Sequence, residues 1–256
     1  MRLALVGDPV GHSRSPAIHT AALAACGIVG TYEARTVDAD GAATAVDDIR
    51  RRALHGLNAT MPHKEVVAGA ADVRDELVTR AGVANTLWHT PDGVAATNTD
   101  VAGILAAWSD AGLPGDAPVV VHGAGGAAAA ALLALEGRSI VVHARRPSTA
   151  VALVARLGVV ASVVDGPVGR GFVLVNATPV GMGGEALPEA FLEGAVGLFD
   201  MAYGGGPTPA VAWATEAGLP VADGLDMLVA QAARSFEIWT GHDAPVDVMR
   251  SAARAG

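Results

Sequence analysis

Lysine is nearly absent from this chain of 256 residues: Lys64 is the only one, and the other sixteen basic residues are arginine. A guanidinium stays protonated to above pH ~12, whereas a lysine amine can lose its proton when burial or neighbouring charges favour the neutral form. One interpretation is therefore that Lys64 performs proton chemistry that arginine cannot perform. The alternative is codon bias, with Lys64 as a single surviving surface lysine.

Cysteine and long hydrophobic runs are also scarce. Cys26 is the only cysteine, which excludes an internal disulfide. No uncharged apolar run reaches the ~18 residues of a membrane helix, although 51% of the residues are hydrophobic. The first residues enter a strand pattern at once and break at Gly7-Asp8-Pro9, so we expect no secretory signal. These features predict a cytoplasmic protein without a membrane partner.

Clusters of positive charge are missing as well. The net charge is −9, and the one short basic run, Arg50-Arg51-Arg52, ends a predicted helix, where cations interact favourably with the helix dipole. This charge balance argues against a nucleic-acid partner. The histidines, including His12, His19 and His63, lack a metal-ligand spacing with carboxylates, so we expect no metal site.

Strand-like and helix-like runs alternate from one end of the chain to the other, which predicts an α/β fold with mostly parallel sheets. The predicted strands cover residues 3–6, 32–37, 57–59, 86–88, 94–96, 119–122, 140–143, 172–176 and 198–200. Helices are expected from Ser15, as the N-cap, to Cys26; up to Arg52; from Lys64 to Ala81 in one or two segments; from Asp100 to Ala111; after Gly126; after Ser148; and from Asp223 to Trp239.

The length suits two modest domains. The character of the sequence changes near residue 101, and a second series of strands and helices begins after the break at 112–116. We expect a first domain at residues 1–101, completed by helices at 226–256, and a second domain at residues 102–225.

A glycine-rich turn opens the second series. The apolar strand from Val119 runs into a Gly-x-Gly-x-x-Ala turn that begins a helix, and a further strand follows about twenty residues on. Glycine lets the backbone turn sharply and approach a pyrophosphate, whose charge is then met by amides at the helix N-terminus. The residues of this predicted phosphate site are Gly123, Ala124, Gly125, Gly126 and Ala127.

Two arginines end the next predicted strand. An NAD enzyme usually carries an acidic residue there for the ribose hydroxyls, but this chain has Arg145 and Arg146. A guanidinium can bind a 2′-phosphate bidentately and stack on adenine, which favours NADP. The alternative is a pair of solvated loop arginines.

Three polar segments follow predicted strands in the first half of the chain: residues 11–16, 58–64 and 98–100. In open α/β sheets the strand exits line the ligand crevice, so these segments can converge on one small molecule. We expect Lys64 and Asp100 to face each other as an acid/base pair. Asp100 could instead cap the helix that follows it.

Taken together, the polar segments resemble the shikimate dehydrogenase family, whose members reduce 3-dehydroshikimate with NADPH. The resemblance covers nearly the whole chain, and the matching segments are residues 7–19, 58–64, 82–87, 98–100, 176–182, 200–209 and 224–236.

The resemblance implies a role for each matched residue. Lys64 and Asp100 would be the catalytic pair, and Lys64 would deliver a proton while hydride adds to the carbonyl carbon. Substrate contacts would come from Ser13, Ser15, Asn58, Thr60, Asn85, Tyr203 and Gln231. NADP contacts would come from Glu76, Gly123, Ala124, Gly125, Gly126, Ala127, Arg145, Arg146, Thr178, Met201, Gly224 and Met227.

Two departures from the family pattern concern the adenosine end of the cofactor: Ala144 stands where Asn is common, and Thr149 stands where a second Arg is frequent. Two alternatives to the main activity stay open at this stage. One is a dehydrogenase of quinate or an amino-substituted analogue, and the other is a catalytically silent NADP-binding regulator. A monomer or a homodimer is expected.

Overall fold

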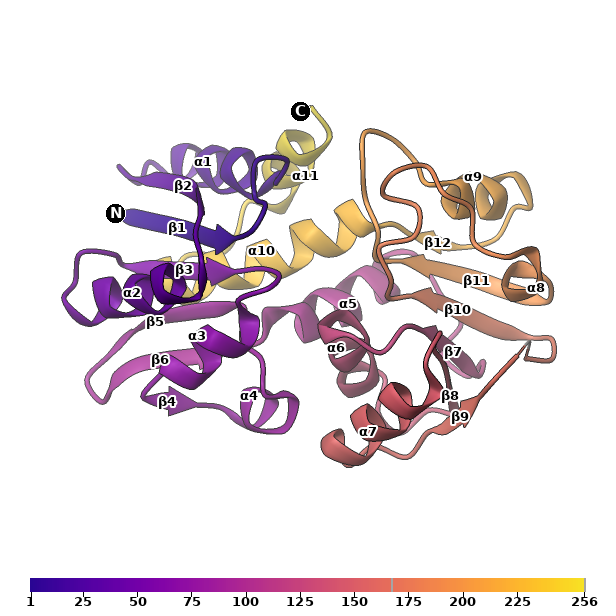
Figure 1. The fold of residues 1–256 in the computed structure, drawn as a ribbon. Helices are drawn as coiled ribbons and strands as arrows, with labels where there is room; N and C mark the ends of the chain where they lie inside the picture. Colours follow the sequence, from indigo (N-terminus) through magenta and orange to yellow (C-terminus); the bar gives the residue numbers. More distant parts are fainter. Residues whose placement is uncertain (167, 256) are drawn as a thin grey trace. The chain divides into compact units, whose positions relative to one another are not determined.

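The computed structural model describes residues 1–166 and 168–255. The chain divides into two compact units, the first formed by residues 1–103 with 228–256 and the second by residues 104–227. Both boundaries lie inside helices, α5 (Thr99–Asp110) and α10 (Gly224–Thr240). Each unit contains one six-stranded sheet (Figure 1).

The first sheet mixes parallel and antiparallel pairs. Its strands are β1 (Arg2–Gly7), β2 (Thr31–Thr36), β3 (Gly56–Ala59), β4 (Val73–Arg74), β5 (Thr86–Thr90) and β6 (Gly93–Thr97). Their order is β2-β1-β3-β5-β6-β4. β1 pairs in parallel with β2 and β3, and β5 is antiparallel to both β3 and β6. Asn58, the polar residue of β3, and Thr86 at the start of β5 therefore lie beside each other.

Side-chain alternation along β1 builds two cores in the first unit, because successive residues of a strand point to opposite faces. Ala4 and Val6 pack in one core with residues of α2 (Ala39–Arg50), α3 (Lys64–Ala70) and α4 (Glu76–Ala81). Leu3 and Leu5 pack in the other core with residues of α1 (Ser15–Ala25), α10 and α11 (Val246–Arg254). The part of α10 from residue 228 onward thus belongs to the first unit although it lies far along the chain.

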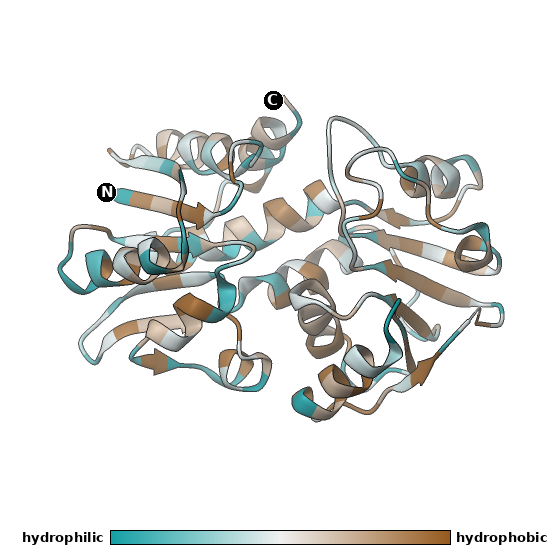
Figure 2. Cartoon of the chain, viewed as in Figure 1, coloured by the Kyte–Doolittle hydropathy of each residue, from teal (hydrophilic) through white to brown (hydrophobic). Residues whose placement is uncertain are grey.

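The second sheet is entirely parallel. Its strands are β7 (Val119–His122), β8 (Ile140–His143), β9 (Ser162–Val164), β10 (Phe172–Asn176), β11 (Ala195–Asp200) and β12 (Val221–Ala222), in the order β12-β11-β10-β7-β8-β9. This is the doubly wound order of dinucleotide-binding domains, with the strand order reversing between β7 and β10. β10 and β11 are predominantly hydrophobic (Figure 2), as buried parallel strands require. The unit also contains α6 (Gly126–Ala134), α7 (Pro147–Leu157), α8 (Glu189–Leu192) and α9 (Pro209–Glu216).

The predicted α/β class with mostly parallel sheets is confirmed, and all nine predicted strands are present. The prediction missed β4, β9, β12, α8 and α9. Ser15 is the first helical residue of α1, so the prediction of Ser15 as the N-cap was wrong. Instead, the Ser15 backbone N–H donates to Ser13 Oγ at 3.2 Å, so the upstream serine provides the acceptor for one N–H group at the start of the helix.

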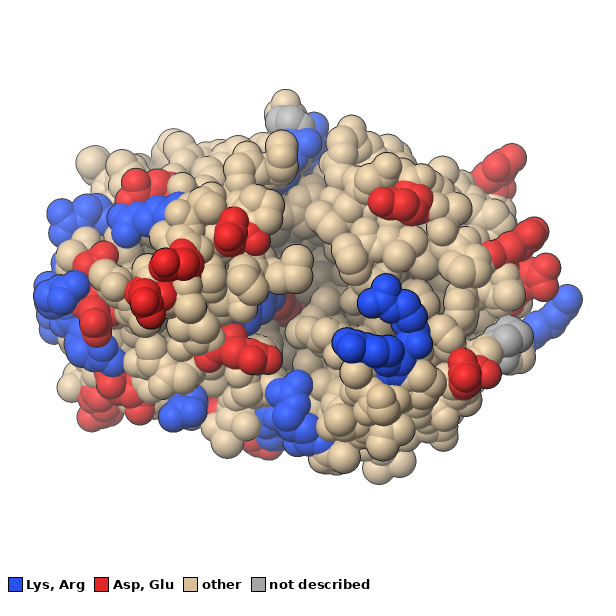
Figure 3. All heavy atoms as spheres, viewed as in Figure 1, with Lys and Arg blue, Asp and Glu red and all other residues tan. Residues whose placement is uncertain are grey.

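Acidic and basic side chains are interspersed over the first unit on the face shown in Figure 3. Ion pairs account for part of this mixture, for example Arg50 with Asp72 at 2.8 Å. Within residues 1–166 and 168–255, no helix combines the length and hydrophobicity needed to span a membrane.

Candidate active site

Lys64 is the first residue of α3, which follows β3 after a short turn. Gly7 makes this turn possible, since a Cβ on Gly7 would lie only 2.3 Å from Thr60 Cγ2. The His63 ring Nε2 is 2.7 Å from the Val37 carbonyl oxygen, which ties the turn to the chain beyond β2. These contacts hold the backbone at Lys64 in place, and the lysine side chain remains partly exposed.

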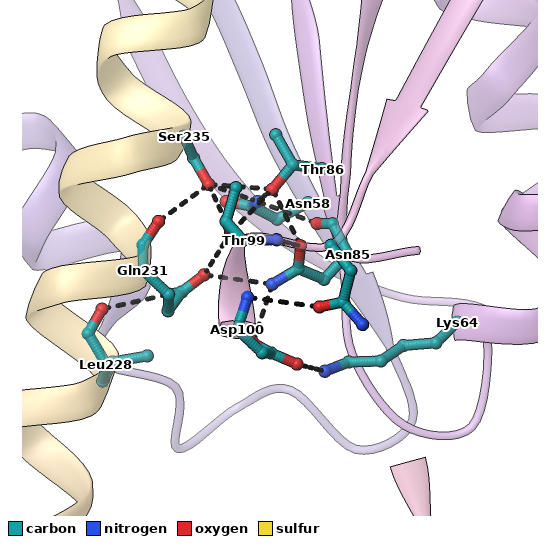
Figure 4. A network of polar contacts seen from close by, with 10 residues as sticks. Asn58, Lys64, Asn85, Thr86, Thr99, Asp100, Leu228, Gln231 and Ser235 are labelled. Carbon is teal, nitrogen blue, oxygen red and sulfur yellow. Dashed lines mark hydrogen bonds and ion pairs between the residues drawn. The ribbon is translucent and has the colours of Figure 1, made fainter. Parts of the chain in front are cut away.

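The ammonium group of Lys64 donates a hydrogen bond to Asp100 Oδ2 (Figure 4). Asp100 lies in the first turn of α5, and its backbone N–H donates to Asn98 Oδ1 at 3.2 Å. Asn98 therefore provides the side-chain acceptor at this helix start, and the interpretation of Asp100 as the N-cap is wrong. The Asp100 carboxylate is 9% exposed and contacts side chains of other elements.

Asn85 holds the second oxygen of this carboxylate. Its Nδ2 donates to Asp100 Oδ1 at 2.8 Å and to Gln231 Oε1 at 3.3 Å. Its Oδ1 accepts from the Thr99 backbone N–H at 2.8 Å. A backbone N–H can only donate, so this contact fixes which end of the Asn85 amide is oxygen. Asp100 therefore receives one N–H from an ammonium and one from an amide.

Asn58 is buried behind this group and bonds within the protein. Its Oδ1 accepts from the Tyr32 hydroxyl at 2.8 Å. Its Nδ2 donates to the Asn85 carbonyl oxygen at 2.9 Å and to Thr86 Oγ1 at 3.0 Å. Both amide hydrogens of Asn58 thus form hydrogen bonds within the first unit, and these bonds hold the segment that carries Asn85 in place.

Four residues of the network were not identified in the sequence: Tyr32, Thr86, Thr99 and Ser235. The only sequence signal for Ser235 is its position four residues after Gln231, which places both on one face of α10. Thr86 and Thr99 adjoin predicted site residues, but a threonine beside an asparagine or aspartate carries no signal of its own.

The other predicted substrate residues lie in different places. Ser13 and Ser15 bond to each other at the start of α1, and Thr60 lies beside Gly7. Tyr203 belongs to the loop after β11 in the second unit. The part of the chain that the structure describes contains no direct hydrogen bond between the two serines and the Lys64 network.

Glu76 belongs to a different unit from the other predicted cofactor residues. It lies in the first turn of α4 in the first unit, with a largely exposed side chain 3.9 Å from Arg80. The remaining predicted cofactor residues belong to the second unit.

The glycine-rich turn has room for a ligand. Gly123 has φ +133°, and a Cβ there would lie 2.7 Å from the Ala177 carbonyl oxygen, so only glycine fits. A Cβ on Gly125 or Gly126 would meet no atom within 4 Å, so the backbone here borders open space. The turn leads directly into α6, whose first amides have no partner within the helix and attract anions. These residues fit a bound pyrophosphate.

A buried polar cluster joins the ends of β10 and β11. Asp200 Oδ1 accepts from Asn176 Nδ2 at 2.8 Å, and Asp200 Oδ2 accepts from the Thr208 hydroxyl at 2.5 Å. Asn176 Oδ1 in turn accepts from the hydroxyl of Thr178 at 2.7 Å. Burial raises the pKa of Asp200, while its hydrogen bonds oppose that shift. This cluster fixes Thr178 and the chain that continues to Met201.

Met201 and Gly224 are brought together, since a Cβ on Gly224 would lie 2.8 Å from the Met201 carbonyl oxygen. Met227 follows one turn later in α10 and is 9% exposed. Arg145 and Arg146 are both exposed directly after β8. Their side chains are therefore accessible to a ligand.

A histidine pair lies at the ends of β7 and β8. The His122 and His143 Nδ1 atoms are 3.0 Å apart. Burial, with a smaller contribution from His143, lowers the pKa of His122 to about 4. The two rings can hydrogen-bond through these nitrogens when one Nδ1 carries a hydrogen and the other accepts it. Among the described residues, no group of three or more His, Cys, Asp or Glu side chains could hold a metal ion.

Comparison with known proteins gives a consistent result. The chain matches the family model of the shikimate dehydrogenase substrate binding domain over residues 5–87 and that of the shikimate 5'-dehydrogenase C-terminal domain over residues 224–254. It is 39% identical to a shikimate dehydrogenase (NADP(+)) of Archaeoglobus fulgidus, with 98% of this chain and 97% of that protein covered. A protein of the same name from Halobacterium salinarum is 38% identical over 98% of this chain and 97% of its own length.

Solved structures agree with the sequence comparison. The shikimate 5-dehydrogenase of Thermus thermophilus, crystallised with NADP(H) and shikimate, superposes with a TM-score of 0.89 at 36% identity, covering 99% of this chain and 98% of that chain.

Proposed function

Because this chain belongs to the shikimate dehydrogenase family, we propose that it catalyses the reversible, NADPH-dependent reduction of 3-dehydroshikimate to shikimate in the shikimate pathway. The observation that carries the proposal is the contact between Lys64 and Asp100, two partly buried groups from different elements. An ammonium held by a carboxylate is a proton donor of fixed position.

We assign the ring acid to the first unit. Ser13 and Ser15 provide two hydroxyl groups for its carboxylate, and Asn85, Gln231 and Thr60 provide polar groups for its hydroxyls. The family resemblance adds Tyr203 as a further proposed contact. Neutral donors of this kind suit a carboxylate and several alcohols, whose oxygens accept or donate hydrogen bonds.

We assign NADP to the second unit, and the family resemblance adds Glu76 as a further proposed contact. The amides from Gly123 to Ala127 hold the pyrophosphate, and Arg145 and Arg146 hold the 2′-phosphate and the adenine. Met201, Gly224 and Met227 would contact the nicotinamide, and Thr178 is a further proposed cofactor contact.

The cofactor supplies the hydride when it is bound, and the residues of the chain manage the proton. Lys64 donates a proton from Nζ to the oxygen that becomes the C3 hydroxyl, and its positive charge stabilises the negative charge developing on that oxygen. Asp100 holds the lysine in place through Oδ2, while Asn85 holds Asp100 through Oδ1. The lysine is partly exposed, so water can return the proton after each turnover.

The test is NADP⁺ reduction, followed by the absorbance of NADPH, with shikimate, with quinate and with no ring acid. We expect turnover with shikimate and much less with quinate. Turnover with quinate but not with shikimate would mean that quinate is the substrate. Tight NADP binding without turnover of either acid would instead indicate a silent regulator.

Lys64 variants test the mechanism. Lys64→Ala should lower kcat by about 10²- to 10⁴-fold, the usual contribution of general acid/base catalysis, with the affinity for NADPH unchanged. Lys64→Arg should also be poor, because arginine keeps the charge but does not release a proton at working pH. Near-normal kcat in Lys64→Ala would exclude the lysine as the proton donor.

A further inference from the structure

Three buried hydroxyl groups from three separate elements meet in the first unit. Thr86 begins β5, Thr99 begins α5 and Ser235 lies in α10. Thr86 Oγ1 is 2.8 Å from Ser235 Oγ and 3.1 Å from Thr99 Oγ1, and Thr99 Oγ1 is 3.2 Å from Ser235 Oγ. All three residues are at most 2% exposed. We call this group the hydroxyl cluster (Figure 4).

The hydroxyl cluster faces amide oxygens on the side of the catalytic pair. Asn85 Oδ1 lies 3.0 Å from Thr86 Oγ1 and 3.1 Å from Thr99 Oγ1. Gln231 Oε1 lies 3.2 Å from Thr99 Oγ1. A hydroxyl can donate one hydrogen bond, so the threonines supply hydrogens to these two oxygens.

The orientation of the two amides follows from this arrangement. With both oxygens turned to the hydroxyl cluster, the amide nitrogen of Asn85 faces Asp100. A flipped Asn85 would place its oxygen against the carboxylate and its NH₂ against the Thr99 backbone N–H, which are unfavourable contacts. Gln231 Nε2 donates to the Leu228 carbonyl oxygen at 3.0 Å, and its second hydrogen has no acceptor within residues 1–166 and 168–255.

We propose that the hydroxyl cluster is a positioning device for the reaction, with Thr86 at its centre. It reinforces the orientation of the Asn85 amide set by the Thr99 backbone N–H, in which Asp100 receives an N–H, and it orients the Gln231 amide so that one N–H stays available for an oxygen of the ring acid. This inference rests on the proposed function, because it assumes that Asp100 and Gln231 serve the ring acid and Lys64.

Thr86 is the position to test because it contacts four other side chains. Its Oγ1 accepts from Asn58 Nδ2 and lies within hydrogen-bond distance of Asn85, Thr99 and Ser235. Thr86→Val keeps the shape and removes the hydroxyl, whereas Thr86→Ser keeps the hydroxyl and removes a methyl group. Any effect of hydrogen bonding is therefore separated from an effect of volume.

We expect Thr86→Val to lower kcat/KM for shikimate about tenfold, the effect of about one lost hydrogen bond. The KM for shikimate should rise, while the KM for NADP⁺ should not change. Thr86→Ser should recover most of this loss. A role in folding alone would lower the fraction of active enzyme without changing either KM.

The matched control is Thr90→Val on the same strand. The Thr90 hydroxyl donates to the Gly93 carbonyl oxygen at 2.9 Å at the far end of β5, so this change also removes one threonine hydrogen bond. It should leave both KM values and kcat as in the wild type. Shikimate affinity measured by calorimetry should follow the same ranking as the KM for shikimate.

The outcomes separate this inference from the proposed function. If the wild type turns over shikimate and Thr86→Val behaves like Thr90→Val, the positioning role is wrong and the function stands. If the wild type neither binds nor turns over shikimate, both are wrong. Should Thr86→Val fail to fold, Ser235→Ala, which adds no volume, gives the same comparison: a KM for shikimate equal to that of the wild type would overturn the proposal.

Discussion

His19 provides a test of the first unit that is independent of catalysis. The side chain lies in α1 at 0% exposure, and neither ring nitrogen has a hydrogen-bond partner among the described residues. The ring stacks on Tyr32, with centroids 4.4 Å apart, and lies 5.2 Å from the Trp239 ring. Burial without a partner penalises the charged form and lowers the pKa of His19 from 6.5 to about 3.

This shift makes the stability of the first unit depend on pH in a defined direction. Below pH 6.5 the unfolded chain binds a proton at His19, whereas the folded protein binds none until about pH 3. The contribution of His19 is therefore fully present above the unfolded pKa and is lost as the pH falls toward the folded pKa. At about 1.4 kcal/mol per pH unit, the loss between about pH 8 and about pH 5 is about 2 kcal/mol.

The perturbation is His19→Leu, which removes the titrating group and keeps most of its volume. Urea unfolding at several pH values gives the free energy of unfolding for both proteins. From about pH 8 to about pH 5, the variant should lose about 2 kcal/mol less than the wild type, whatever its stability at the upper pH. Other groups with lowered pKa values, such as His122 in the second unit, are common to both proteins and cancel in the difference.

The control is Ile18→Val, which removes a methylene from the same buried core and no titratable group. Its unfolding free energy should have the pH dependence of the wild type. Parallel curves for His19→Leu and the wild type would refute the reasoning, since they would mean that His19 is protonated in the folded protein or has a hidden partner that compensates its burial.

Two further predictions concern the second unit. Arg145→Ala and Arg146→Ala should each raise the KM for NADPH about tenfold and leave the KM for NADH nearly unchanged, because a charge-assisted hydrogen bond to the 2′-phosphate is lost; equal effects on both cofactors in steady-state kinetics would contradict this assignment. Gly123→Ala should cost about 1–3 kcal/mol of folding free energy, because φ is +133° and the new Cβ would crowd Ala177. Thermal unfolding would measure the loss of stability, and NADPH titration would measure any loss of cofactor affinity. An unaltered melting temperature would disprove the close contact.

The local pattern of the sequence was sufficient to predict much of the fold. Strand-like runs alternating with helix-like runs marked all nine predicted strands, and the turn at 91–93 marked the hairpin of β5 and β6. The missed strands β4 and β12 have two residues each, too few to show a period of two. Both errors at helix starts have one cause: the side chains of Ser13 and Asn98 accept from the backbone N–H two residues later, so Ser15 and Asp100, which make those N–H bonds, were wrongly expected to be the caps.

The candidate site was only partly predictable, because its residues differ in how much they depend on tertiary structure. Lys64 is conspicuous in the composition, and Asp100 follows from its place at a strand exit. The hydroxyl cluster has no such signal, because its members are separated by up to 149 residues and become neighbours only when α10 packs on the first sheet. An isolated serine or threonine in the sequence is equally consistent with a surface position.

The geometry around Asp100 determines how the lysine variants must be interpreted. Lys64→Ala removes the proton donor and also leaves the carboxylate with only the Asn85 N–H, so its effect combines chemistry with the cost of an uncompensated, partly buried charge. Lys64→Arg keeps a positive charge for Asp100 and removes only the ability to release a proton. If charge pairing were the whole role of Lys64, arginine would restore activity. A kcat of Lys64→Arg close to that of Lys64→Ala, in a protein that binds shikimate normally, therefore isolates proton transfer as the reason for the single lysine.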